Sequence, residues 1–424
     1  MRPLVLGPTS VLVPQNRWDL IPPGPAPTVT VVVPHYEQPV QLARVLAALG
    51  RQSAGRLEVV VADDGSAAVP VVPPGVRLVR QEDLGFRAAA ARNLGAATST
   101  ADVLVFLDAD TVPEPGFVEA LVRRVAACPD VLAVGRRRHA DLSGSGAELP
   151  EPSWLREGYR ASRDLLDADG RSFRFVISAV LACRRSLFED LGGFDERFVG
   201  YGGEDWDFAY RAWNAGAVLV HEADAVAWHD GPEWAGRGDV ASRAVKDAES
   251  ARLAALVPEP LTRGAPLPAE IPDVLVDLES YDVRCVHGLL RQEHRDLRVR
   301  VAAPVDGLHA TAVRTEPWSE DQLRRARVRL RLERPVLLAP SVVGDLVDSL
   351  TRHAMGELVL TVEGAVVGTA QSARALGRAR RWEGAGTDVV GWAFGRADLE
   401  VPVVVPRDDL AGFLAAPWGA LQDP

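Results

Sequence analysis

The sequence predicts an α/β fold built around a mostly parallel, Rossmann-like sheet. Three runs rich in β-branched and apolar residues, at 28–33, 57–62 and 103–107, are typical of strands buried on both faces. Between them, residues 40–49 and 88–97 carry apolar side chains at helical spacing. Alternation of strands and helices is typical of sheets whose neighbouring strands run parallel.

Each of the three runs is followed directly by polar residues. The clusters are Pro-His-Tyr-Glu at 34–37, Asp-Asp-Gly-Ser at 63–66 and Asp-Ala-Asp at 108–110. The carboxyl ends of parallel strands meet at one edge of the sheet, and ligands bind there. One such cluster would be an ordinary turn, but three in consecutive units predict a shared site.

The chain of 424 residues is too long for one ordinary core, so we expect two domains. We place a proline-rich arm at 1–27, a first domain at 28–257, a proline-rich linker at 258–273 and a second α/β domain at 274–424.

The second domain repeats the pattern of the first. Shifted by 240 positions, Leu49 and Gln52 meet Leu289 and Gln292, among others, while the segment 101–111 lies against 356–366. That second match puts Glu363 and Ala365 opposite Asp108 and Asp110. We interpret the second domain as a degenerate copy without the acids, although any two apolar strand–helix units look alike.

The formal net charge of −11 argues against nucleic acid as a partner. Three widely spaced cysteines, Cys128, Cys183 and Cys285, predict buried thiols and neither a disulfide framework nor a zinc site. No run of about 18 uncharged apolar residues is present, so no transmembrane segment is expected. The prolines of the arm argue against a signal peptide. We expect a cytoplasmic protein and leave peripheral membrane association open.

The triplet Asp108-Ala109-Asp110 is the first candidate for chemistry. A turn can aim both carboxylates at one ion, and hard oxygen ligands suit Mg²⁺ or Mn²⁺ that also binds a diphosphate. On its own the triplet is more often a plain turn.

The second candidate is Gly-Gly-Glu-Asp-Trp-Asp at 202–207. Gly202 and Gly203 permit close approach of the backbone to a sugar, and an adjacent acid can remove the proton of a hydroxyl group. Alternatively, the acids favour the N-terminus of a helix that begins here, and both interpretations are compatible.

Five segments in order resemble the family 2 glycosyltransferases. They are VTVVVPHYEQPVQLARVLAAL, VVVADDGS, GFRAAAARNLGAA, VLVFLDAD and GGFDERFVGYGGEDWDFAYR, within residues 28–233. The last is also similar to a region of β-1,4-galactosyltransferases and chondroitin-type polymerases. The resemblance implies a GT-A fold and an inverting mechanism that transfers a sugar from a nucleotide-diphosphate donor, expected to be a UDP-sugar, to a carbohydrate or small-molecule hydroxyl.

Roles for individual residues follow from this resemblance. It implies Asp205 as the general base, Glu204 as a residue that positions hydroxyls, and an acceptor site at Gly202, Gly203 and Trp206, although Trp206 is equally plausible as plain packing. A Mn²⁺ or Mg²⁺ ion would be held by Asp110, Asp108 and His229, with His221 as a weaker alternative ligand. The nucleotide-sugar would contact Pro34, Tyr36, Glu37, Asp63, Asp64, Arg87, Arg92, Asp108 and Ala109, with Asp63 or Asp64 accepting from the base. His35 departs from the small polar residue usual at its position.

Two other functions are compatible with these motifs. One is a sugar nucleotidyltransferase, against which the lack of a glycine- and lysine-rich phosphate loop argues. The other is a non-catalytic sugar- or nucleotide-binding partner, against which the intact acidic segments argue. For the second domain we expect acceptor binding, dimerisation to a homo-oligomer, or stabilisation.

Overall fold

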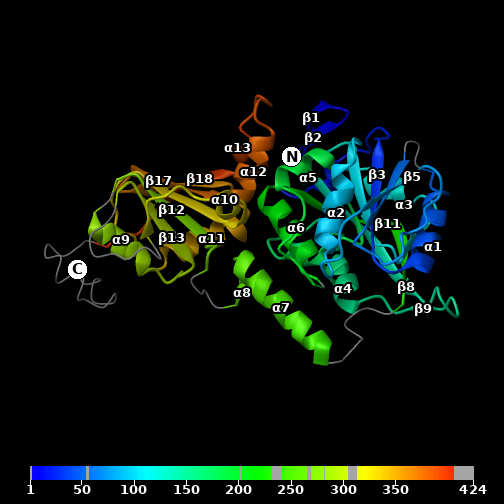
Figure 1. Ribbon diagram of the computed structural model, residues 1–424. Coiled ribbons are helices and arrows are strands. Elements are labelled where there is room, and N and C mark those ends of the chain that lie inside the picture. The colour runs from blue at the N-terminus through cyan, green and yellow to red at the C-terminus, as the bar shows by residue number, and fades with distance from the viewer. Residues whose placement is uncertain are drawn as a thin grey trace. The chain divides into compact units, whose positions relative to one another are not determined.

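The computed structural model describes residues 2–53, 57–200, 202–231, 240–264, 269–280, 282–303 and 313–404 (Figure 1). The chain divides into two compact units. The first holds Met1–Trp213 and Ala217–Leu253, and the second holds Asn214–Gly216 and Ala254–Pro424. Parts of the expected linker and second domain, at 265–268, 304–312 and 405–424, lie outside the described residues.

The first unit is built on one mixed sheet. Its strands are β3 (Val29–His35), β4 (Leu57–Asp63), β5 (Val76–Arg80), β6 (Val103–Leu107), β7 (Thr111–Pro113), β8 (Val131–Ala140), β9 (Glu148–Leu149), β10 (Val180–Arg184) and β11 (Val218–Asp230). Their order is β5-β4-β3-β6-β10-β8-β11-β7, with β9 beside β8. The four strands from β5 to β6 are parallel, so the predicted α/β class is confirmed.

Within its described residues, the first unit also contains seven α-helices, of which α7 continues into the second unit. They are α1 (Pro39–Leu49), α2 (Ala88–Ala97), α3 (Phe117–Val122), α4 (Ser153–Ala161), α5 (Arg185–Leu191), α6 (Glu204–Asn214) and α7 (Val240–Leu256). Helix α2 packs on β3 and β4, and its Gly95 lies so close to Val32 that an added Cβ would be 2.4 Å from a methyl group. The unit change between Leu253 and Ala254 therefore falls inside α7.

Strand β3 runs past Pro34, where the sequence predicted its end. The carbonyl of His35 accepts a hydrogen bond from Asp64 N (2.8 Å), so the backbone polar groups of His35 point toward β4. The backbone of Pro34 therefore points toward β6, but the pairing of β3 with β6 ends at Val32. Because proline has no N–H and no partner strand lies opposite it on this side, the sheet loses no hydrogen bond.

Strand β11 is long and irregular. It runs from Val218 to Asp230 through a register shift between Glu222 and Val226. Such a bulge re-aims the strand that follows it, and here that strand carries His229.

The proline-rich arm belongs to the first unit. It forms a hairpin of β1 (Leu4–Gly7) and β2 (Ser10–Leu12), followed by the 3₁₀ turn η1 (Trp18–Leu20). The buried Asn16 amide donates to the carbonyls of Leu165 (2.6 Å) and Leu219 (2.9 Å), which fixes the arm to the core by polar contacts.

The second unit has a seven-stranded sheet. Its strands are β12 (Val274–Leu278), β13 (Leu297–Val301), β14 (Val313–Arg314), β15 (Val328–Leu332), β16 (Glu357–Val362), β17 (Ala365–Ser372) and β18 (Arg396–Glu400), and its helices are α8 (Pro260–Arg263), α9 (Val283–Leu290), α10 (Glu320–Arg325), α11 (Val342–Thr351), α12 (Ala373–Arg381) and α13 (Val389–Ala393). The order β14-β13-β12-β15-β17-β16-β18 repeats, with the same strand directions, the order from β5 to β11 in the first unit.

This topology corrects one correspondence drawn from the sequence. Segment 356–366 forms β16 and the start of β17. The strand that corresponds to β6 is instead β15, because β15 pairs in parallel with β12 just as β6 pairs in parallel with β3. Register therefore puts Glu333 and Pro335 where Asp108 and Asp110 stand, and not Glu363 and Ala365. The earlier match failed because apolar strands of similar length align equally well in sequence.

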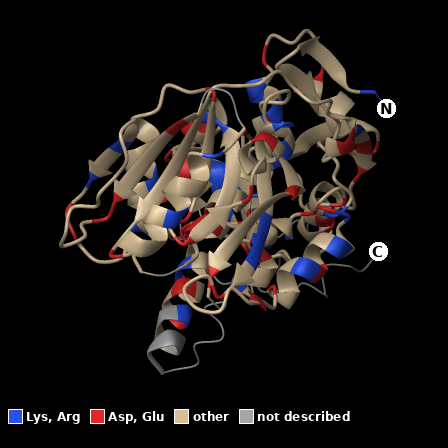
Figure 2. Cartoon of the chain, turned by 90° about the vertical axis from the view of Figure 1, so that its right-hand side faces the viewer, with Lys and Arg blue, Asp and Glu red and all other residues tan. Residues whose placement is uncertain are grey.

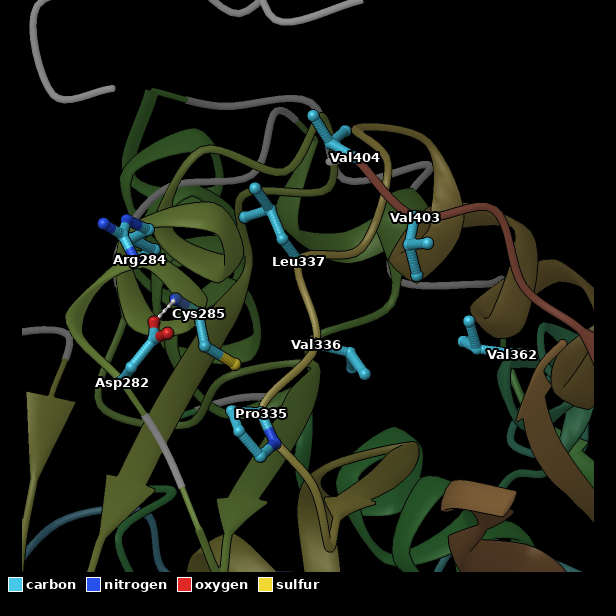
Figure 3. Close-up of a pocket in the computed structure, with 9 residues that line it drawn as sticks. All are labelled: Asp282, Arg284, Cys285, Pro335, Val336, Leu337, Val362, Val403 and Val404. Carbon is cyan, nitrogen blue, oxygen red and sulfur yellow. Dashed lines mark hydrogen bonds between the residues drawn. The ribbon is translucent and has the colours of Figure 1, made fainter. Parts of the chain in front are cut away.

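A pocket of about 250 Å³ lies beside residues that follow β12 and β15 (Figure 3). Asp282 there accepts from Cys285 N (2.9 Å) and so caps α9. The lining is largely apolar and consists of Asp282, Arg284, Cys285, Pro335, Val336, Leu337, Val362, Val403 and Val404.

Acidic and basic residues are interspersed over the elements visible in Figure 2. Among the described helices, none is both long enough and apolar enough to cross a membrane. Cys128, Cys183 and Cys285 are all buried, and none of them is in a disulfide.

Candidate active site

The triplet 108–110 forms the turn between β6 and β7. The amide of Thr111 donates to the carbonyl of Asp108 (3.0 Å) and closes the turn. Ala109 is buried, while the side chains of Asp108 and Asp110 keep 30% and 23% of their surface exposed. Ala109 thus anchors the turn and contributes no side chain to binding, whereas both carboxylates remain accessible.

His229 reaches Asp110 through strand pairing. Strand β7 lies antiparallel to β11 with Thr111 opposite His229, and His229 Nε2 is 3.5 Å from Asp110 Oδ2. His229 Nδ1 lies 3.2 Å from the carbonyl of Gly231, which favours the proton on Nδ1 and leaves a lone pair on Nε2. Burial and the charge of Asp108 raise the Asp110 pKa, and His229 opposes that rise.

The three predicted metal ligands are not all directed at one point. Asp108 Oδ1 accepts from Arg92 (2.8 Å) instead of facing His229. Among the described residues, no group of three or more His, Cys, Asp or Glu side chains is arranged to hold an ion. Asp110 and His229 nevertheless offer one oxygen and one nitrogen ligand to a divalent cation. The carbonyl of Gly231 contacts the other ring nitrogen of His229 and would orient the imidazole, so the pair fits such an ion.

His139 lies beside this pair and was missed in the sequence. Its register partner in the parallel β8–β11 pair is His229, and the two ring centroids are 4.8 Å apart. His221, the alternative ligand, lies elsewhere: it stacks on Tyr159 at 3.6 Å and contacts Asp164 (2.7 Å). No spacing rule flags His139, because only the pairing of β8 with β11 brings it to the site.

Arg92 joins the two acidic segments. It lies on α2, is 3% exposed, and donates to Asp108 (2.8 Å) and Glu204 (2.9 Å). Burial by itself would lower the Arg92 pKa, but Asp108 and Glu204 outweigh it and raise the pKa. The guanidinium is therefore a fixed positive charge between the turn after β6 and the start of α6.

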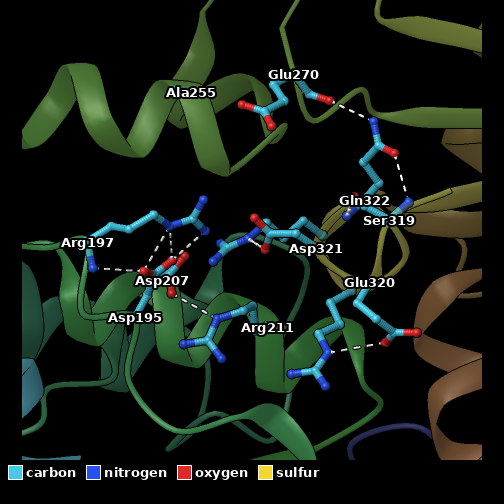
Figure 4. A network of polar contacts seen from close by, with 12 residues as sticks. Asp195, Arg197, Asp207, Arg211, Ala255, Glu270, Ser319, Glu320, Asp321 and Gln322 are labelled. Carbon is cyan, nitrogen blue, oxygen red and sulfur yellow. Dashed lines mark hydrogen bonds and ion pairs between the residues drawn. The ribbon is translucent and has the colours of Figure 1, made fainter.

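Asp205 is the second residue of α6. Burial, followed by the negative charge of Glu204, raises its pKa to about 7, against the opposing charge of Arg92. Its Oδ1 accepts from the amide of Trp206 (2.8 Å). The same helix is held in place one turn later, where Arg211 Nε donates to the buried Asp207 (2.8 Å) (Figure 4). The acids lie in the first turn of α6, where negative charge stabilises a helix N-terminus. The carboxyl group of Asp205 can also exchange a proton near neutral pH.

Gly202 and Gly203 precede α6 with φ of +91° each. An added Cβ would lie 2.8 Å from the Glu249 carboxylate at Gly202 and 2.7 Å from the Phe198 ring at Gly203. Both conformation and space therefore require glycine here. Glu249, on α7, is a second residue that the sequence did not point to.

Asp63 is committed to structure. Its carboxylate contacts His35 Nδ1 (2.8 Å), Ser66 Oγ (2.6 Å), Ser66 N (3.1 Å) and Arg80 (2.9 Å). These contacts occupy its four lone-pair directions. They also explain the unusual His35, which is buried against Asp63 at the matching register of β3 and β4.

Asp64 retains acceptor capacity. It accepts from Gln81 Nε2 (2.6 Å) and Arg87 N (2.7 Å), two of four possible contacts. Nearby, Glu37 accepts from Ala67 N (2.6 Å), and Tyr36, 41% exposed, donates to Asp83 (3.2 Å). The guanidinium of Arg87 donates a hydrogen bond to the Glu82 carbonyl and lies 3.6 Å from Asp64. Pro34 is half-buried in β3.

Two family models match this unit. Residues 30–192 match "Glycosyl transferase family 2", and residues 169–221 match "N-terminal domain of galactosyltransferase". Residues 30–192 belong to glycosyltransferase family 2. The second match of this family 2 domain covers the start of α6, where Glu204 and Asp205 lie.

Individual proteins similar to the chain are also transferases. Chondroitin synthase of Escherichia coli is 28% identical over 315 residues, which cover 64% of this chain and 46% of that protein. Pre-mycofactocin glycosyltransferase of Mycobacterium tuberculosis (strain ATCC 25618 / H37Rv) is 34% identical over 221 residues, 49% of this chain and 44% of that protein. The chain thus spans less than half of either relative. A solved structure, mannosyltransferase PcManGT from Pyrobaculum calidifontis in complex with GDP-Man and Mn²⁺, is 22% identical with a TM-score of 0.41, covering 55% of this chain and 65% of that one.

Proposed function

We propose that the family 2 domain is an inverting glycosyltransferase that moves a sugar from a nucleotide-diphosphate donor to an acceptor hydroxyl. One observation supports this proposal most directly: Arg92 donates to both Asp108 and Glu204, so the acids after β6 and those at the start of α6 share one buried guanidinium. A donor bound at the carboxyl edge of the sheet would then present its anomeric carbon near Asp205.

Asp205 is the proposed general base. The acceptor oxygen forms a bond to the anomeric carbon, the bond from that carbon to the diphosphate oxygen breaks, and the hydroxyl proton passes to Asp205. A pKa of about 7 leaves a large share of Asp205 ionised at neutral pH and able to accept this proton. Glu204, neutralised by Arg92, would bind hydroxyls, and Gly202 and Gly203 would let the sugar approach the backbone.

Asp110 and His229 would hold a divalent cation, Mn²⁺ or Mg²⁺, with Asp108 close by. When bound, the ion would supply positive charge for the departing diphosphate. Arg92 contributes a fixed charge of its own at the same turn. The expected UDP base would be contacted through Asp64, because Asp63 has no lone pair left, with Pro34, Tyr36, Glu37 and Arg87 around it.

The second unit is proposed to have no transferase chemistry of its own. Its positions equivalent to Asp108 and Asp110 hold Glu333 and Pro335, and the pocket beside them is largely apolar. A role in acceptor binding, dimerisation or stabilisation remains the proposal for this unit.

A donor screen tests the transferase proposal. The purified full chain is incubated with Mn²⁺ and UDP-, GDP- or dTDP-sugars, and release of nucleoside diphosphate is measured with and without acceptors. Turnover that is lost in Asp205→Asn supports the proposal. Donor binding without turnover would point to a non-catalytic partner, and pyrophosphate formation from a sugar phosphate and nucleoside triphosphate would point to a nucleotidyltransferase.

A further inference from the structure

An exposed indole stands beside the start of α6. Trp154, on α4, is 39% exposed. Its ring is edge-on to Trp206 at 6.5 Å and stacked on Phe175 at 6.5 Å. Trp206 is backed in turn by the buried Phe173 at 6.1 Å. The aromatic layer thus holds Trp154 and Trp206 in place while one indole remains open to a ligand.

A lysine also lies beside Trp206. Lys246, on α7, is the only lysine of the chain, and its Nζ is 5.7 Å from the Trp206 ring centroid. Nζ also contacts both carboxylate oxygens of Glu249 (2.9 Å each), and Glu249 is only 7% exposed. This pair backs the glycine loop, because an added Cβ at Gly202 would meet the same carboxylate.

We propose that Trp154 and Trp206, with the Lys246–Glu249 pair, form the subsite for a neutral pyranose ring of the acceptor. This inference rests on the proposed function, since Asp205 directly precedes Trp206 and would receive the proton of the hydroxyl presented there. The C–H face of a pyranose packs on an indole, and its rim of hydroxyls bonds to an ammonium and a carboxylate.

Charge decides between a neutral and an acidic ring. Among the described residues of this cluster, the acids Asp108, Glu204, Asp205 and Glu249 stand against the cations Arg92 and Lys246, which leaves two negative charges in excess when all are ionised. Both cations are already paired, Arg92 with Glu204 and Asp108, and Lys246 with Glu249. A uronate carboxylate would add to this excess of negative charge, so we expect the subsite to favour an uncharged sugar.

The kinetic test uses Trp154→Ala. With p-nitrophenyl glycosides of neutral hexoses and of glucuronate as probes, we expect the acceptor KM to rise about tenfold, a larger effect than the effect on donor hydrolysis, and Trp154→Phe to retain most of the affinity. Trp392→Ala, a half-buried tryptophan of the second unit, is the matched control. An unchanged acceptor KM, or an equal loss of donor hydrolysis, would overturn the subsite.

A binding test does not depend on turnover. Reductive methylation with ¹³C-formaldehyde labels Lys246 and the α-amino group alone and keeps their charge. Neutral glycosides should shift the dimethyl-Lys246 NMR signal in the unmodified sequence and not in Trp154→Ala. A shift without donor turnover keeps the subsite and rejects the transferase, whereas turnover without a shift for any glycoside rejects the subsite alone. Loss of both rejects both.

Discussion

His229 Nε2 lies 3.5 Å from Asp110 Oδ2, across the antiparallel pairing of β11 with β7. An imidazole nitrogen with a free lone pair therefore faces a carboxylate whose pKa is raised by burial and by Asp108. Two electron-rich atoms in this arrangement need either a shared proton or a cation between them.

Removing either member of this pair should weaken metal binding. We expect Asp110→Ala and His229→Ala each to reduce Mn²⁺ affinity by at least about tenfold, since each removes a donor atom. Electron paramagnetic resonance of free Mn²⁺ measures this directly, and EDTA should abolish transfer until Mn²⁺ is restored. His353→Ala, at an exposed histidine of the second unit, is the control. Unchanged Mn²⁺ affinity in both site variants would rule out this pair as the metal site.

Asp205→Asn should reduce transfer by about 10²–10⁴-fold, because general-base catalysis contributes on that scale. In the unmodified protein, kcat/KM should rise with pH and level off above about pH 7, since the active form is the ionised carboxylate. Steady-state kinetics from pH 5 to 9 measure both. A variant that keeps full activity, or a profile that is flat across pH 7, would exclude Asp205 as the base.

The same variant should change stability in a pH-dependent way. The folded-state pKa of Asp205 lies above its usual value, so the folded protein holds the proton more tightly and loses stability as pH rises from about 4 to 7. Asparagine mimics the neutral form and should therefore raise Tm more at pH 8 than at pH 4.5. Differential scanning calorimetry at the two pH values measures the difference, and an equal shift at both would show that burial of the charge is not costly.

Arg92→Met should destabilise the first unit by about 3–5 kcal/mol, because it leaves the Glu204 carboxylate buried without its partner. Adding Glu204→Gln should restore part of that loss. Urea unfolding of both single variants and the double variant forms the cycle that isolates the coupling. Additive losses in the double variant would mean that the two side chains do not stabilise each other.

Gly203→Ala should cost more than the left-handed backbone alone explains. Gly75 has a similar φ of +89° but no neighbour within 4 Å of an added Cβ, whereas Gly203 would place it 2.7 Å from Phe198. Gly75→Ala should therefore lower the free energy of unfolding by about 1–2 kcal/mol, and Gly203→Ala by more and with loss of transfer. Chemical denaturation and the donor assay compare them. Equal costs would show that Phe198 yields to the methyl group.

Local pattern sufficed for the regular elements of the first unit. Helix α2 and strand β6 lie where the spacing of apolar residues predicts them. The polar clusters after β3, β4 and β6 were also expected to meet, because parallel strands in register end at one edge of the sheet. In the structure Asp63 pairs in register with His35. Which acid of such a cluster is free was not predictable, since it depends on partners such as Arg80 that come from other strands.

The sequence by itself determined the α/β class, the family 2 resemblance and the acids that its motifs carry, because these depend on local spacing and residue type. Only the tertiary structure decided that Asp108 turns to Arg92 while Asp110 faces His229, and that β15, not β16, corresponds to β6. The contact of Asp110 with His229 depends on strand order and on the bulge of β11, which bring together residues more than a hundred positions apart. Asp108-Ala109-Asp110 is one motif in the sequence, but in the folded chain its two acids have different partners.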